Sequence, residues 1–314
     1  MPKIPRSKDG RPYIVPPGGD KAVLYTRTSK FASTLDDGYG LDLWHQHLIA
    51  KGIADNTWTL SKIRQTYTEA EARGYDWNKM NGVCAQIRRL AGADEKAEYG
   101  DLVHELCERL DKGEPLGDYP AVVDADLMAY EYRTENLRHT HHEGFVVNDK
   151  WGIAGSFDKR TYIDNEVTPD GEPFNDFAIG DVKTGRIDGQ DVKFSIQFTG
   201  YADSEFYECT HDVEGEPSKE QCNDNAGAHK RTPLEVNSKW AVLIHVPAQT
   251  GTCELYWVDL EKGRALGELA QQVRKDRRVR TFTPFVLWDD GVSTTATPSI
   301  SGEGVVTTEE EEVA

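Results

Sequence analysis

The chain has 314 residues, 38% of them hydrophobic and 29% charged, so it can bury one sizeable core or two modest ones. Its formal net charge of −18 excludes a protein that coats nucleic acid through overall positive charge, but not an enzyme with a narrow basic groove. Seven of the acids follow Trp288 in a stretch without Lys or Arg, so residues 1–288 still carry −11.

The sequence shows no targeting or membrane segment. No apolar run is long enough to cross a bilayer, and the polar, Pro- and Gly-rich residues 1–20 lack the apolar core of a secretory signal. We therefore expect a cytoplasmic protein that does not enter a membrane.

The cysteines predict free thiols. They are odd in number, widely spread and include no C-x-x-C pair, so neither a zinc knuckle nor a thioredoxin-like site has support in the sequence. Such cysteines stay reduced in a cytoplasmic protein. The five are Cys84, Cys107, Cys209, Cys222 and Cys253.

In chain order, residues 1–20 predict a flexible arm, and residues 21–290 predict a single domain. Residues 41–140 favour helices, because apolar side chains recur at steps of three and four. The clearest helix covers residues 101–110, with Gly113 as its stop. Its apolar stripe consists of Leu102, Val103, Leu106 and Leu110.

The second part, residues 141–280, is rich in short β-like runs, which indicates an α/β fold. A long polar connection between residues 212 and 233 predicts a surface excursion. Residues 291–314 have little to bury and predict a disordered acidic tail. Strands are expected at 144–147, 151–157, 160–163, 177–183, 239–246 and 253–258, with helices at 119–136, 190–207 and 260–279.

Asp181 and Lys183 are the first candidates for chemistry. They lie two residues apart on a predicted strand, so both side chains leave the same face while Val182 points into the core. A carboxylate there can bind a hard divalent cation, and an ammonium can orient a water or offset charge on a phosphate under attack. Taken alone, Asp-x-Lys is more often a salt bridge at a sheet edge.

A second carboxylate, Asp158, strengthens the catalytic interpretation. It ends a β-rich run that contains Gly155, which lets another backbone or a ligand come close. It lies 23 residues before Asp181, which leaves room for a hairpin that makes the two strands neighbours. Two carboxylates on adjacent strands form a cation site that neither forms alone; an ordinary turn residue is the alternative for Asp158.

Three polar residues on predicted helices complete the set. Gln197 and Tyr201 are spaced i and i+4, so they share one face of the helix that follows the Lys183 strand. His104 lies on the amphipathic helix 101–110. Singly, these residues are more often part of a polar helix surface.

Together, these residues resemble the RecB-like PD-(D/E)XK exonucleases, which include CRISPR-adaptation nucleases and phage-encoded relatives. The resemblance covers about residues 100–207. The matching motifs, in the order of the family, are His104, the Gly-x-x-Asp of Gly155 to Asp158, the Asp-x-Lys of Asp181 to Lys183, and the Gln-x-x-x-Tyr of Gln197 to Tyr201.

The resemblance implies a restriction-endonuclease-like core, with a central mixed sheet flanked by helices and a helical N-terminal part. It also implies an Mg²⁺ or Mn²⁺ site, and a water that Lys183 assists, with Gln197 and Tyr201 lining the site near DNA. The implied metal ligands are His104, Asp158, Asp181, the Val182 carbonyl and, as a looser match, Glu143.

The same resemblance bears on iron. Many CRISPR-associated relatives hold an iron–sulfur cluster on one early cysteine and a compact trio near the C-terminus. Cys84 could be the early one, but Cys209, Cys222 and Cys253 are scattered here, so we do not expect a cluster.

Positive charge gathers at residues 273–280, where five bases lie within eight residues. Contact with DNA phosphates is one interpretation of this run. A solvated helix C-terminus, which the helix dipole favours, is the other.

We therefore expect a metal-dependent DNA exonuclease that hydrolyses phosphodiesters without a covalent intermediate. It would process DNA ends or single strands in phage replication or recombination, in the host cytoplasm, and a recombination protein is a candidate partner. One alternative is a structure-selective endonuclease that cuts flaps or junctions. The other is a non-catalytic recombination or adaptor protein on the same fold, although no member of the motif set is missing.

Overall fold

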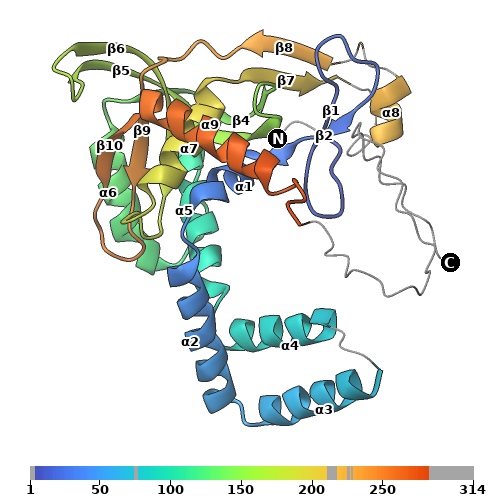
Figure 1. Cartoon of the computed structure of the whole chain (residues 1–314). Coiled ribbons are helices and arrows are strands. Elements are labelled where there is room, and N and C mark those ends of the chain that lie inside the picture. Colours follow the sequence, from blue (N-terminus) through green and yellow to red (C-terminus); the bar gives the residue numbers. More distant parts are fainter. Residues whose placement is uncertain (1–3, 74–76, 211–217, 225–226, 228, 283–314) are drawn as a thin grey trace, which may run out of the picture. The chain divides into compact units, whose positions relative to one another are not determined.

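The structure, a computed structural model, describes residues 4–73, 77–210, 218–224, 227 and 229–282. The chain divides into two compact units, residues 1–277 and residues 278–314. The first unit is α/β, with a central mixed sheet flanked by helices, as predicted (Figure 1). The predicted acidic tail lies outside the described residues.

In the described part of the chain, the main sheet has the strand order β10-β9-β6-β5-β4-β7-β8, and the short β3 lies beside β5. Its pairs are antiparallel except for β6 with β9 and β3 with β5, which are parallel. A separate hairpin joins β1 and β2. The strands are β1 (Tyr13–Ile14), β2 (Val23–Leu24), β3 (Thr26–Arg27), β4 (Arg138–Asn148), β5 (Ile153–Val167), β6 (Pro173–Lys183), β7 (Glu205–Cys209), β8 (His229–Pro233), β9 (Trp240–His245) and β10 (Glu254–Asp259).

The helices α2, α3 and α4 pack against one another, and Gly52 of α2 lies so close to Ile87 of α4 that no side chain fits between them. None of the described helices combines the length and apolar character that a membrane span requires. The helices are α1 (Thr28–Ala32), η1 (Ser33–Leu35), α2 (Tyr39–Asp55), α3 (Trp58–Arg73), α4 (Trp77–Leu90), α5 (Glu95–Lys112), η2 (Ala121–Val123), α6 (Asp124–Thr134), α7 (Asp191–Ala202), α8 (Lys219–Asp224) and α9 (Leu260–Asp276).

The alternation of side chains along β6 divides the core between two faces of the sheet. Ala178 and Val182 pack with residues of α5 and α6, while Ile179, between them, packs with residues of α7. Helix α9 covers α7, and Gly263 allows this close approach because a side chain there would meet the backbone of Ser195 (Figure 1). The D-x-K end of β6 therefore lies between two helical layers.

The amphipathic helix is confirmed and is longer than its clearest segment. Val103 and Leu106 of α5 are buried, and Leu102 and Leu110 pack at the edge of the same cluster. Gly113 ends the helix in the left-handed conformation, with φ of 67°, and its N–H donates to a carbonyl of the last turn. The stripe therefore fixes the orientation of α5 and with it that of His104.

The N-terminal segment differs from its prediction. Residues 4–20 do not form a loose arm, because Ile4 and Ile14 are buried among β4, β5 and β7. The segment is rich in Pro and Gly, but its few apolar residues, such as Ile4 and Ile14, pack against the edge of the sheet. Residues 4–20 accordingly belong to the compact unit that contains the sheet.

Three further predictions of elements are wrong in detail. The two short strands predicted at 151–157 and 160–163 are one continuous strand, β5. The helix predicted to reach residue 207 ends at Ala202, and the next residues form β7. The predicted excursion after residue 212 returns to the sheet as β8, which pairs with β7.

Candidate active site

Asp158 and Asp181 occupy the strand positions just beyond the end of the ladder between β5 and β6. The last pair on this side is Lys159 with Gly180, and the next residue on each strand is one of the two acids. The backbone N–H of Val182 donates to the Asp158 carboxylate, at 2.8 Å, in place of a further ladder hydrogen bond. The first acid is thus fixed to the strand that carries the second.

Asp181 and Lys183 lie on the same face of β6, as their spacing predicts, and they form an ion pair. Asp181 is only 2% exposed, while the Lys183 side chain is 22% exposed. Lys183 Nζ also lies 3.2 Å from the carbonyl oxygen of Val182. Burial, opposed by the charge of Asp158, lowers the pKa of the Lys183 ammonium.

His104 reaches the two strands from α5. Its Nδ1 lies 3.3 Å from Asp158 Oδ2. Burial acts to raise the pKa of Asp158, but the contact with His104, the charge of Lys183 and the Val182 N–H together lower it. Asp158 is therefore held as a carboxylate, the form that binds a cation.

Glu143 approaches Asp158 from the other side. On β4, His142 pairs with Lys159 and Gly144 with Phe157, so Glu143 lies across from Asp158. Its φ of 53° is in the left-handed region, which an L-residue seldom adopts. Burial and then the charge of Asp158 raise the pKa of Glu143. The charge of Asp158 thus disfavours a second carboxylate beside it, and a bound cation would offset this repulsion.

A cleft of about 510 Å³ opens beside His104, Glu143 and Asp158. Its lining has five carboxylates, so without a cation it would repel a phosphate. Neither Asp181 nor Lys183 lines it, and these two side chains pair with each other. The lining consists of Asp101, His104, Glu105, Glu108, Lys112, His142, Glu143, Asp158, Lys159 and Val182.

The acids of α5 are part of the site that sequence reasoning missed. Asp101, Glu105 and Glu108 line the cleft together with His104. The signal was present, since positions 101, 104, 105 and 108 follow helical spacing and share one face. These acids come near Asp158, however, only because α5 packs on the sheet, and sequence spacing does not show that packing.

A buried polar network behind the cleft was also missed. Lys159 donates to Asp111 and, at 2.5 Å, to the hydroxyl of Tyr130. His139 Nε2 and His142 Nδ1 lie 3.6 Å and 3.9 Å from the Asp111 carboxylate. The network fixes Lys159, the neighbour of Asp158, so it supports the site from within the core.

Gln197 and Tyr201 share one face of α7, as predicted, and the Gln197 amide donates to the Tyr201 hydroxyl at 3.3 Å. Both are buried, and the Tyr201 ring packs in the core cluster that contains Phe157. Burial and then the charge of Asp158 raise the pKa of Tyr201. The Tyr201 ring is thus part of the core, while its hydroxyl is close enough to Asp158 for that charge to affect its pKa.

The basic run 273–280 is partly used in the fold. Arg274 donates to Thr26 Oγ1 at 3.0 Å and lies over the Phe31 ring. Arg277, the residue that caps α9, donates to the Thr34 carbonyl at 3.4 Å. Both contacts tie the end of α9 to the segment around α1.

The predicted ligands suit a divalent cation by their chemistry. Carboxylate and carbonyl oxygens with one imidazole form the type of set that binds Mg²⁺ or Mn²⁺. Within the described residues, however, the side chains that already stand in a metal-binding arrangement are Cys209, Cys222 and His229. At the cleft, a cation would have to draw the Asp181 carboxylate away from Lys183.

In comparisons with known proteins, no family model and no curated protein matches this chain.

Proposed function

We propose that this chain is a divalent-cation-dependent DNA nuclease that hydrolyses phosphodiester bonds, with a core similar to that of the RecB-like PD-(D/E)XK exonucleases. The observation that carries the proposal is the position of Asp158 and Asp181 just beyond the end of the β5–β6 ladder, where Asp158 accepts the Val182 N–H and Asp181 pairs with Lys183. His104 and Glu143 line the same cleft as Asp158 and would add two further ligands.

The chain's own residues divide the work. His104, Glu143, Asp158, Asp181 and the Val182 carbonyl would hold Mg²⁺ or Mn²⁺. Such a cation supplies Lewis-acid stabilisation of the charge that builds on the phosphate oxygens. The acidic lining needs that cation before it can accept a phosphate at all.

Lys183 serves the attacking water. Its Nζ lies beside Asp181 and the Val182 carbonyl, so it is held at the strand end and not free to leave it. Burial lowers its pKa, which makes the ammonium a readier proton donor and increases the fraction of the side chain that is neutral amine at a given pH. At this position it orients a water or neutralises the phosphate under attack.

The activity is tested on linear and closed circular DNA, single- and double-stranded, with and without Mn²⁺. Cleavage of linear DNA alone supports an exonuclease, and nicking of closed circles supports the endonuclease alternative. Absence of cleavage of every substrate with Mg²⁺ or Mn²⁺ would contradict the nuclease proposal and favour a non-catalytic recombination or adaptor protein.

Cation binding has a readout of its own. After chelation, Mn²⁺ should raise the melting temperature of the wild-type chain, since a ligand at about a hundred times its Kd stabilises by about 2.7 kcal/mol. Asp158→Asn should lose most of this shift, and Glu166→Gln, on the exposed part of the same strand, should retain it.

A further inference from the structure

Two thiols and one imidazole that could bind a metal ion lie close together in the fold, and none of them lines the acidic cleft. Cys209 is the last residue of β7, Cys222 lies on α8, and His229 is the first residue of β8. One ligand atom from each lies within 4.8 Å of the other two. Sequence spacing alone gave no reason to group them.

The distance between the two sulfur atoms fits a shared metal ion. Cys209 Sγ and Cys222 Sγ are 4.0 Å apart. With Zn–S bonds of about 2.3 Å and a tetrahedral angle, two thiolates on one zinc ion lie about 3.8 Å apart. A disulfide would need the sulfur atoms at about 2.05 Å, so the chain would have to move to form one.

We propose that Cys209, Cys222 and His229 bind a zinc ion that joins β7, α8 and β8. Thiolate and imidazole ligands select zinc, whereas the carboxylates of the cleft suit Mg²⁺ or Mn²⁺, so the two sites are chemically independent. The trio supplies three of the four ligands of a tetrahedral zinc ion. All five cysteines are free in the structure, as the sequence predicts, and the proposal assigns two of these thiols to a zinc ion.

The surroundings show what such an ion would stabilise. Helix α8 has only six residues, too few to be stable alone. Cys222 is 1% exposed, but its local core is small: Val15 and Ala22, with Tyr13 and Cys209 at its edge. Strand β8 forms the edge of the sheet and pairs with β7. A metal crosslink would contribute folding free energy where the apolar core contributes little.

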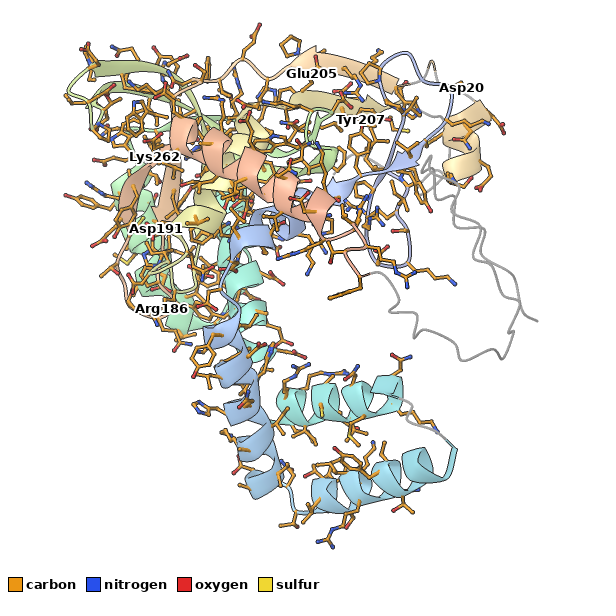
Figure 2. The ribbon with its side chains drawn as sticks, viewed as in Figure 1. Asp20, Arg186, Asp191, Glu205, Tyr207 and Lys262 are labelled. Atoms are coloured by element: carbon orange, nitrogen blue, oxygen red, sulfur yellow. The ribbon has the colours of Figure 1, made fainter. Side chains whose placement is uncertain are left out.

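The site is also connected to the N-terminal hairpin. Tyr207, labelled on β7 in Figure 2, stacks on the His229 ring with centroids 5.4 Å apart. Its hydroxyl accepts the N–H of Val15 at 3.1 Å. Asn223 of α8 accepts the N–H of Ala22 at 2.7 Å. Loss of the ion should therefore loosen residues 13–24 as well as β8.

Binding has a proton balance that can be measured. Zinc binds cysteine as the thiolate, so each thiol must lose its proton on binding. A zinc ion that takes both cysteines as thiolates releases two protons to solvent. The apparent affinity should therefore weaken as the pH falls.

The test measures zinc by mass spectrometry in the full-length chain, purified without added metal, and then cobalt uptake after chelation. We expect one zinc ion per chain and the absorption bands of tetrahedral cobalt–thiolate coordination. Cys222→Ser, Cys209→Ser and His229→Gln should each lose both. Cys84→Ser, on α4, is the matched control and should keep them.

The half-buried Cys209 and His229 are the variants of choice if Cys222→Ser fails to fold. Reduced, folded wild-type chain that takes up neither zinc nor cobalt would overturn the proposal, as would iron with sulfide in place of zinc. Equal metal loss in Cys84→Ser would overturn it as well. None of these outcomes depends on whether the chain cuts DNA.

Discussion

The carboxylate of Asp158 accepts the backbone N–H of Val182 at 2.8 Å, so the first acid of the site is bonded to the strand that carries the second. Asp158 therefore has a structural role in addition to any role in binding a cation. Substitutions that keep or remove its hydrogen-bond acceptor separate the two roles.

We predict that Asp158→Ala destabilises the chain by about 1–3 kcal/mol more than Asp158→Asn. Alanine leaves the Val182 N–H without its acceptor, while the asparagine carbonyl replaces it. Urea denaturation of both variants, in the presence of a chelator, measures the difference. Equal stabilities would mean that the hydrogen bond does not contribute.

The pair of Asp181 and Lys183 predicts non-additive stability. Lys183→Ala leaves the buried Asp181 carboxylate unpaired, which should cost about 3 kcal/mol in the free energy of unfolding. Adding Asp181→Asn to that variant should restore most of the loss, because no buried charge then remains. A double-mutant cycle checks this. Additive losses would show that the two side chains do not interact in solution.

His139 predicts a pH dependence of stability. Burial lowers its pKa from 6.5 to about 4, although Asp111 acts in the opposite direction and Lys159 and His142 in the same one. Between these two pH values, the unfolded chain takes up a proton at His139 that the folded chain does not. The contribution of His139 to stability is therefore fully present above pH 6.5. The free energy of unfolding falls by up to about 3 kcal/mol as the pH approaches 4.

The control for this prediction is His139→Asn. Its amide can replace His139 Nδ1, which lies 2.8 Å from Thr161 Oγ1, but it does not titrate. The variant should lose less stability than the wild type between pH 6.5 and pH 4. Parallel curves for the two proteins would assign the acid sensitivity to other groups.

Variants of Gln197 and Tyr201 test whether this buried pair contributes to DNA cleavage as well as to the fold. Tyr201→Phe spares the ring packing but removes the hydroxyl that accepts from Gln197. We expect cleavage to slow about tenfold to a hundredfold, with a nearly unchanged melting temperature. Gln197→Ala should have a similar effect, whereas Tyr201→Ala should cost about 3–5 kcal/mol of stability. Full activity in Tyr201→Phe and Gln197→Ala would leave both residues a purely structural role.

Local patterns in the sequence predicted the elements that carry the site. The stripe of α5 and its Gly113 stop follow from helical spacing, and the common face of Asp181 and Lys183 follows from the strand period of two. Both patterns are complete within a few residues, so no tertiary information was needed.

Predictions failed where pairing between distant segments decides the structure. Tyr207 continues the apolar spacing of α7, which is why the helix was predicted to reach it. The chain instead turns at Asp203 and Ser204, and the next residues pair with β4 as strand β7. Ile14 is surrounded by Pro and Gly, and only the sheet edge gives it a core. The trio of Cys209, Cys222 and His229 likewise forms only because β8 pairs with β7.

The most direct test of the nuclease proposal is the single-turnover rate of cleavage of linear DNA, measured with and without Mn²⁺. Wild type and Glu166→Gln should cleave at the same Mn²⁺-dependent rate, and Asp158→Asn should be slower by at least about a hundredfold. Cleavage by Asp158→Asn at the wild-type rate, or equal cleavage with and without the cation after chelation, would contradict the assignment of this cleft as the active site.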